Sequence, residues 1–193
     1  MHQYWVIGAV VGLAVVAAAA VWFGWLRRRG PRLRQALESV AIDRMQNVLV
    51  PNGMGGQIQI EHLLLTGGGL VVIDVKEFEG TIFASDRMEE WTVMGKKGRF
   101  TFPNPLGTLY DRVAALKQLV RDVPVAGFVL FGAAADFSKG RPRDVLLPGE
   151  LVDRFRKPDR ADLERLLDAF APHWDQVKSA VEPVTAGARA QLR

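Results

Sequence analysis

The sequence predicts an α/β domain, with a central mixed β-sheet flanked by helices, preceded by one transmembrane helix. Three observations support this fold class. Residues 5–26 form an uncharged apolar run. Residues 57–66 and 70–75 are apolar segments of strand length on either side of three glycines. Residues 105–122 have helical periodicity and precede the apolar segment 125–131, an order typical of the strand–helix–strand crossover in α/β folds.

The run at residues 5–26 has the length of a membrane-spanning helix, because about 22 residues rise about 33 Å. Aromatic residues stand near both of its ends, at Tyr4, Trp5, Trp22 and Trp25. An arginine cluster follows it, at Arg27, Arg28, Arg29, Arg32 and Arg34. This pattern predicts an inner-membrane or plasma-membrane protein with a cytoplasmic domain. A cleaved signal peptide is the main alternative, but its basic residues would precede the apolar run.

Small residues recur at four-residue spacing in the same run, at Gly8, Gly12, Ala20 and Gly24, and Val16 interrupts the series. Such a stripe predicts a homodimer formed through close packing of two transmembrane helices. The alternative is that glycine and alanine are simply common in membrane helices, and the interruption favours this interpretation.

The composition is that of one modest domain plus the anchor. The chain has 193 residues, of which 49% are hydrophobic and 24% are charged. It has no cysteine, which excludes a disulfide scaffold and a thiolate metal site. The formal net charge is +4, and residues 27–29 carry three of these charges. A broadly basic surface for nucleic acid is therefore not indicated on the domain itself.

Further elements are expected on both sides of the glycine-linked hairpin. Strands are expected at 47–50, 80–84, 90–94, 99–102 and 144–147, and helices at 32–45, 151–155 and 161–177. The strands between residues 80 and 102 should extend an antiparallel sheet, and Pro172 should kink or split the last helix. We expect an anchor at residues 1–30, the domain at 31–178 and a mobile tail at 179–193.

Three charged side chains stand in the two hairpin strands. Asp74 and Lys76 point to one face of the second strand, because side chains alternate along a strand that is otherwise apolar. Glu61 lies in the first strand, where a register shift of one or two residues would bring its carboxylate beside Asp74. Paired carboxylates suit Mg²⁺, and a nearby lysine suits phosphate charge, which together favour metal-assisted phosphodiester hydrolysis. The alternative is an Asp74–Lys76 ion pair with Glu61 exposed.

The order of these residues resembles the nuclease-related domain (NERD) family of the PD-(D/E)XK nuclease superfamily. The resemblance covers residues 48–120 and rests on Glu61-His62, Ile73-Asp74-Val75-Lys76, Gly80, Trp91 and Asn104-Pro105. It implies a restriction-endonuclease-like fold with Glu61 and Asp74 as metal ligands, the Val75 carbonyl beside them, and Lys76 as the catalytic lysine. The implied cofactor is Mg²⁺ or Mn²⁺.

Two positions depart from the family pattern. The family opens its first helix with Gly-Glu, where this chain has Gly30-Pro31. Glu38 is a displaced substitute for that acid or, more simply, an exposed helix carboxylate. After Asn-Pro the family carries a glutamine, where this chain has Thr108.

Contacts with a substrate are less sharply indicated. Lys96, Lys97 and Arg99 lie at a turn, where they either grip a phosphate backbone or are simply solvated. Trp91 either stacks on a base or packs in the core. His62 points away from Glu61 if the strand is regular, which favours a core or edge histidine.

The sequence therefore predicts a membrane-anchored, Mg²⁺-dependent nuclease that hydrolyses the phosphodiester bonds of nucleic acid. The alternative is a nuclease fold without catalysis that serves as a membrane-tethered module for binding nucleic acid or protein.

Overall fold

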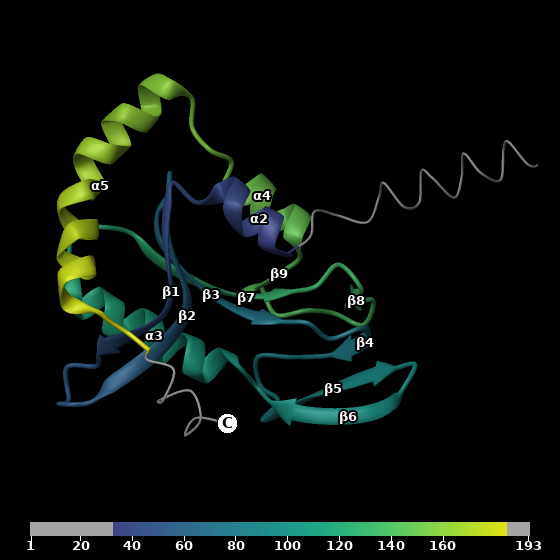
Figure 1. Ribbon diagram of the computed structural model, residues 1–193. Helices are drawn as coiled ribbons and strands as arrows, with labels where there is room; N and C mark the ends of the chain where they lie inside the picture. The colour runs from purple at the N-terminus through teal and green to yellow at the C-terminus, as the bar shows by residue number, and fades with distance from the viewer. Residues whose placement is uncertain (1–32, 185–193) are drawn as a thin grey trace, which may run out of the picture. The chain divides into compact units, whose positions relative to one another are not determined.

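The computed structural model describes residues 33–184, and Figure 1 shows how their helices and strands are arranged. The predicted transmembrane helix with its aromatic and small-residue pattern, the arginines at 27–29, and the chain beyond residue 184 lie outside this range. Among residues 33–184, no helix is both long and apolar enough to cross a membrane.

The centre of the domain is a six-stranded sheet with the order β10-β1-β2-β3-β7-β9. Its strands are β1 (Asp43–Pro51), β2 (Gln57–Thr66), β3 (Gly69–Lys76), β7 (Val125–Phe131), β9 (Val145–Leu146) and β10 (Glu182–Pro183). Neighbouring strands from β10 to β3 are antiparallel, whereas β3, β7 and β9 run parallel. The predicted mixed sheet is confirmed.

Helix α3 (Leu106–Leu119) covers one face of this sheet (Figure 1). It lies between β3 and its parallel partner β7 in the chain, so the predicted crossover is confirmed. Leu109 and Leu116 of α3 are fully buried in the core that this helix forms with the sheet. The approach to β7 is close at Gly127, where a Cβ atom would lie 2.5 Å from Cγ2 of Val113.

A second, four-stranded sheet has the order β6-β5-β4-β8. Its strands are β4 (Gly80–Phe83), β5 (Glu90–Gly95), β6 (Gly98–Pro103) and β8 (Ala135–Asp136). The strands between residues 80 and 102 pair antiparallel as predicted, but they belong to this second sheet and do not extend the central one. The chain leaves β3 after Lys76 and turns at Gly80, whose φ of 114° favours glycine and where a Cβ would lie 2.3 Å from the Met94 carbonyl oxygen.

Helices α2 (Leu33–Val40) and α4 (Pro148–Arg154) lie beside each other on the other face of the six-stranded sheet (Figure 1). A smaller core joins them to the sheet, made of Ala36, Leu37, Val40, Ala41, Leu64, Val71, Ile73, Phe128, Leu130, Leu146 and Leu151. The larger core lies on the α3 side and also holds Trp91 of β5 and Trp174 of α5 (Arg160–Ala180). The central sheet is therefore buried on both faces.

Three element boundaries differ from the sequence prediction. The helix expected at 32–45 ends at Val40, because residues from Asp43 onward pair with β2 and the strand ladder outweighs the helical pattern. Pro172 does not split helix α5, which is continuous from Arg160 to Ala180, and Trp174 beyond the proline packs into the larger core. β10 pairs with β1 within the segment that the sequence assigned to the tail.

Candidate active site

Glu61 and Asp74 face each other at the end of the β2–β3 ladder. The last paired residues are His62 and Ile73, so the next position along the two antiparallel strands brings Glu61 opposite Asp74. Oε2 of Glu61 accepts a hydrogen bond from the backbone N–H of Val75 at 3.1 Å. The two acids are therefore neighbours without the register shift that the sequence interpretation allowed.

An irregularity in β1 and β2 sets the direction of Glu61. The ladder between these strands skips the pair Asn47 and Glu61, and Asn47 has a φ of 51°, a left-handed conformation that asparagine tolerates. Ile60 and Leu63 both pack in the larger core, whereas regular alternation would send them to opposite faces. The alternation of side chains between the two faces of the sheet is therefore interrupted in β2 at Glu61.

His62 lies close to Glu61 because the strand is irregular there. Its Nε2 is 3.8 Å from Oε1 of Glu61, and its side chain is 16% exposed. Burial lowers the pKa of His62, and the negative charge of Glu61 opposes this effect. Nδ1 of His62 is the one buried side-chain nitrogen or oxygen without a hydrogen-bond partner among residues 33–184. The expectation of a histidine directed away from Glu61 assumed a regular strand, which β2 is not.

Asp74 is the one charged residue that is buried in the described part of the chain, at 3% exposure. Burial raises the pKa of its carboxyl, and the positive charges of Arg112 and Lys76 oppose that rise. Lys76 is half-buried at the end of β3, on the same face as Asp74. The sequence-predicted residues Glu61, Asp74 and Lys76 thus lie on the two adjacent strands β2 and β3, just past the last pair of their ladder.

Arg112 of α3 contacts Asp74 and was not predicted from the sequence as part of this site. Its Nη1 donates to Oδ2 of Asp74, and its Nε donates to the carbonyl oxygen of Gln59 at 2.6 Å. A signal was present, because an arginine at position 112 falls at helical spacing between the apolar residues Leu109 and Leu116. A charged residue on a core-facing stripe is costly to bury unless it pairs with a group of opposite charge, so its presence predicts a buried partner.

The Asn-Pro pair before α3 has a structural role. Nδ2 of Asn104 donates to the Met88 carbonyl oxygen at 2.8 Å, and its Oδ1 accepts from the N–H of Leu106 at 3.0 Å. The side chain thereby ties the loop before β5 to the first turn of α3. Trp91 is fully buried and donates from Nε1 to the carbonyl oxygen of Ser85, so it packs rather than stacks on a base.

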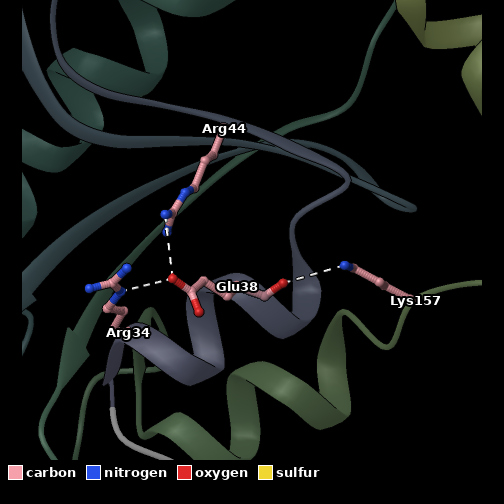
Figure 2. A network of polar contacts seen from close by, with 4 residues as sticks. All are labelled: Arg34, Glu38, Arg44 and Lys157. Carbon is pink, nitrogen blue, oxygen red and sulfur yellow. Dashed lines mark hydrogen bonds and ion pairs between the residues drawn. The ribbon is translucent and has the colours of Figure 1, made fainter.

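Glu38 belongs to a separate polar network on the α2 side (Figure 2). Its Oε1 accepts from Nε of Arg34 at 2.8 Å and from Nη2 of Arg44 at 3.4 Å, and Lys157 donates to its backbone oxygen at 3.3 Å. The hydrogen bond from Arg34 lowers the pKa of Glu38. Within residues 33–184, no hydrogen bond or ion pair joins Glu38 to either acid of the candidate site.

The basic residues proposed for substrate contact lie elsewhere. Lys96 and Lys97 form the turn between β5 and β6, and Arg99 follows at the start of β6. Lys97 and Arg99 are exposed. In the part of the chain that the structure describes, no hydrogen bond or ion pair joins them to Glu61, Asp74 or Lys76.

The donor set fits a magnesium ion, which is bound in proteins through one or two carboxylates and keeps several waters. Glu61 and Asp74 supply two hard oxygen ligands. The Val75 N–H points to Glu61, and the carbonyl of the same residue projects to the same side of a strand. Among residues 33–184, no three Asp, Glu, His or Cys side chains gather as a metal cage, so the remaining ligands would be backbone and water oxygens.

Comparisons with known proteins found one family model and one relative that match the chain. An uncharacterized protein of Bacillus anthracis is 27% identical over 89 residues, an alignment that covers 46% of this chain and 42% of that protein. The chain thus spans less than half of that relative's length. No solved structure matches the chain. The nuclease-related domain model matches residues 31–132, more than half of the 193 residues, and this range includes Glu61, Asp74, Lys76 and Arg112. The chain belongs to the nuclease-related domain family.

Proposed function

We propose that this protein is a metal-dependent nuclease that hydrolyses phosphodiester bonds of nucleic acid. One observation carries the proposal: Glu61 and the buried Asp74 lie opposite each other just past the end of the β2–β3 pairing, with Lys76 two residues further along β3. Burying Asp74 costs free energy unless a positive charge compensates it, so the site is built to hold cations. Membership of a nuclease-related family supports the same chemistry.

In this proposal Glu61, Asp74 and the Val75 carbonyl would hold Mg²⁺ or Mn²⁺. The cation would neutralise phosphate charge and make the attacking water more acidic. Lys76 is placed to orient that water and to offset the charge that develops on a phosphate oxygen. The water oxygen forms the new bond to phosphorus, the bond to the leaving oxygen breaks, and the leaving oxygen takes up a proton.

We propose that nucleic acid also contacts Lys96, Lys97 and Arg99 through its phosphates. Such contacts would be local, because the described residues carry 19 of the 25 basic residues and all 21 acidic residues of the chain. A net negative domain binds a polyanion only where its cations are concentrated. Phosphate contacts would position the strand without reading its sequence.

The sequence further supports a membrane-anchored protein, and we propose this location on the apolar run and the arginines that follow it. The domain would then face the cytoplasm, next to the inner or plasma membrane. A homodimer through the small-residue stripe at Gly8, Gly12, Ala20 and Gly24 is the less favoured part of this proposal, because Val16 interrupts the stripe.

A second candidate function is a binding module without catalysis. Two observations favour it: Oδ2 of Asp74 already pairs with Arg112, and Glu38 is held by arginines instead of joining the acids. If a metal cannot displace Arg112 from Asp74, the site stays without metal and cannot catalyse hydrolysis. The domain would then only bind nucleic acid or a protein partner.

The deciding experiment is a calorimetric titration of the full chain with Mn²⁺ and with Mg²⁺, followed by a cleavage assay on mixed DNA and RNA. Asp74→Asn keeps the shape of the side chain and an acceptor for Arg112 but removes the charge. We expect it to lower metal affinity by about 100-fold or more and to abolish cleavage. Asp153→Ala, which removes an exposed acid of α4, should match the parent. Cleavage that persists in Asp74→Asn would refute the mechanism, and binding of nucleic acid without metal or cleavage would establish the second candidate.

A further inference from the structure

Arg112 fills the gap beside Asp74 where β2 and β3 no longer pair. Below the last rung at His62 and Ile73, the backbone of Gln59 pairs with β1 but has no partner in β3. The Arg112 side chain bridges this gap, with Nε on the Gln59 carbonyl and Nη1 on Asp74. A guanidinium thus stands beside the carboxylate that the proposed function assigns to the metal.

Packing alone does not explain an arginine at this position. It lies on the core-facing side of α3, and its side chain is 19% exposed while that of Asp74 is 5% exposed. Removing two charges from water costs about as much as their attraction returns, so an apolar pair of similar volume would stabilise the fold equally well. The ion pair is therefore better explained by the chemistry of the site.

The guanidinium also keeps unused donors. Arginine has five N–H groups in a planar fork. Within residues 33–184, hydrogen bonds are made by Nε and Nη1 of Arg112, and none is made by Nη2. The remaining N–H groups suit a phosphate oxygen, which arginine binds in the same forked geometry as a carboxylate.

Resting on the proposed nuclease function, we propose that Arg112 is the counter-ion that a metal must displace from Asp74, and that the displaced guanidinium then binds a phosphate oxygen of the nucleic acid. Before metal binds, Arg112 neutralises the buried carboxylate and holds it in place. When the metal takes over this charge, Arg112 is free beside the acids, where the scissile phosphate arrives. The same residue thereby links metal binding to substrate binding.

The first test measures Mn²⁺ affinity by calorimetry on the full chain. Arg112→Gln removes the competing cation and should bind Mn²⁺ about tenfold more tightly or better, because a unit charge at this range changes the proton affinity of a carboxylate by one to three orders of magnitude. Arg112→Lys keeps the charge and should stay closer to the parent. Arg121→Gln, just beyond α3 and exposed, is the matched control and should not differ.

The second test measures binding of a short fluorescent oligonucleotide in the presence of Ca²⁺, at several salt concentrations. Loss of one phosphate contact in Arg112→Gln should weaken binding and reduce the slope of log K against log salt by about one. Arg112→Lys should restore that slope. A residue with only a structural role would leave the slope unchanged.

A third measurement uses the wild-type chain, so that it does not depend on how the variants fold. Addition of Mg²⁺ should shift the NMR signal of the Arg112 Nε–H group as the guanidinium leaves Asp74. Two results would overturn the role of Arg112 and leave the nuclease proposal intact. One is Mg²⁺ binding, detected by calorimetry, without a shift of the Arg112 signal. The other is an Arg112→Gln variant whose Mn²⁺ affinity equals that of the parent. If the Arg112→Gln variant binds metal and the wild-type chain does not, Arg112 competes with the metal as proposed, but the wild-type chain is not a metal-dependent nuclease. Absence of metal binding in both would overturn both proposals.

Discussion

Replacing Gly127 with alanine tests how closely α3 must approach the sheet. The added Cβ would lie 2.5 Å from Cγ2 of Val113 and 3.0 Å from Cδ1 of Leu109. Carbon atoms in contact prefer about 3.5–4.0 Å, so the Val113 contact is about 1 Å too short. Valine is stiff at χ1 in a helix, and the interior around it is close-packed, so α3 itself must shift.

The expected cost follows from two opposing effects. Overpacking of a core typically destabilises a protein by about 1–3 kcal/mol. The reduced freedom of the unfolded chain returns about 0.4–1 kcal/mol when glycine becomes alanine. We therefore expect Gly127→Ala to lower the free energy of unfolding by about 1.5 kcal/mol and the Tm by about 5 °C.

Thermal unfolding of the full chain, followed by circular dichroism, measures this effect, and two variants control it. Gly107→Ala lies in α3 with no atom within 4 Å of the added Cβ, and it should stabilise by about 0.5–1 kcal/mol. Val113→Ala removes the clashing methyl, so the double variant with Gly127→Ala should be more stable than the sum of the single changes predicts. A Gly127→Ala protein as stable as the parent, or a strictly additive double variant, would refute the close-packing argument.

Two further predictions concern the framework around the site. Trp174→Phe removes the hydrogen bond from Nε1 to Oδ2 of Asp43 at 2.7 Å and should cost about 2 kcal/mol in thermal unfolding, whereas Asp43→Asn, which keeps an acceptor, should cost less. Hydrogen bonds from Arg141 lower the pKa of Glu150 below its ordinary value of 4.5, so the folded state favours the ionised form. The stability that Glu150 contributes is then fully present above about pH 4.5 and is lost as the pH falls through the lowered pKa. The difference in Tm between the parent and Glu150→Gln should therefore be largest at neutral pH and shrink as the pH is lowered below about 4.5, and a difference that stays constant with pH would contradict this.

Local patterns predicted much of the fold. The hairpin of β2 and β3, the helix α3 and the strand β7 follow from apolar runs, glycines and helical spacing, which are properties of the neighbouring residues. The split into two sheets was not predicted. It depends on the turn at Gly80 and on the pairing of β4 with β8, which is about fifty residues away in the chain, and strand partners at such separation leave no local signal.

The candidate site was predicted only in part, because the sequence predicts what neighbouring residues determine but not which distant segments meet. Asp74 and Lys76 share a face because strands alternate, and this needs only the local sequence. The direction of Glu61 depends on the irregularity that β2 shares with β1 at Asn47, which becomes apparent only when the two strands are paired. Arg112 could have been singled out as a charge on an apolar stripe, but its partner Asp74 is 38 residues away and becomes evident only in the folded chain.

Helix α3 connects the packing of the domain to the chemistry of the site. It is fixed at its start by Asn104 and in its middle by the contact of Val113 with Gly127, and Arg112 is the residue before Val113. A shift of α3 away from β7 must therefore lengthen the path from the Arg112 backbone to Asp74 and weaken their ion pair. If Arg112 competes with the metal, Gly127→Ala should raise Mn²⁺ affinity in the same direction as Arg112→Gln but by less, and Gly107→Ala should leave it unchanged. Unaltered Mn²⁺ affinity in a destabilised Gly127→Ala protein would show that the position of α3 and the occupancy of Asp74 are independent.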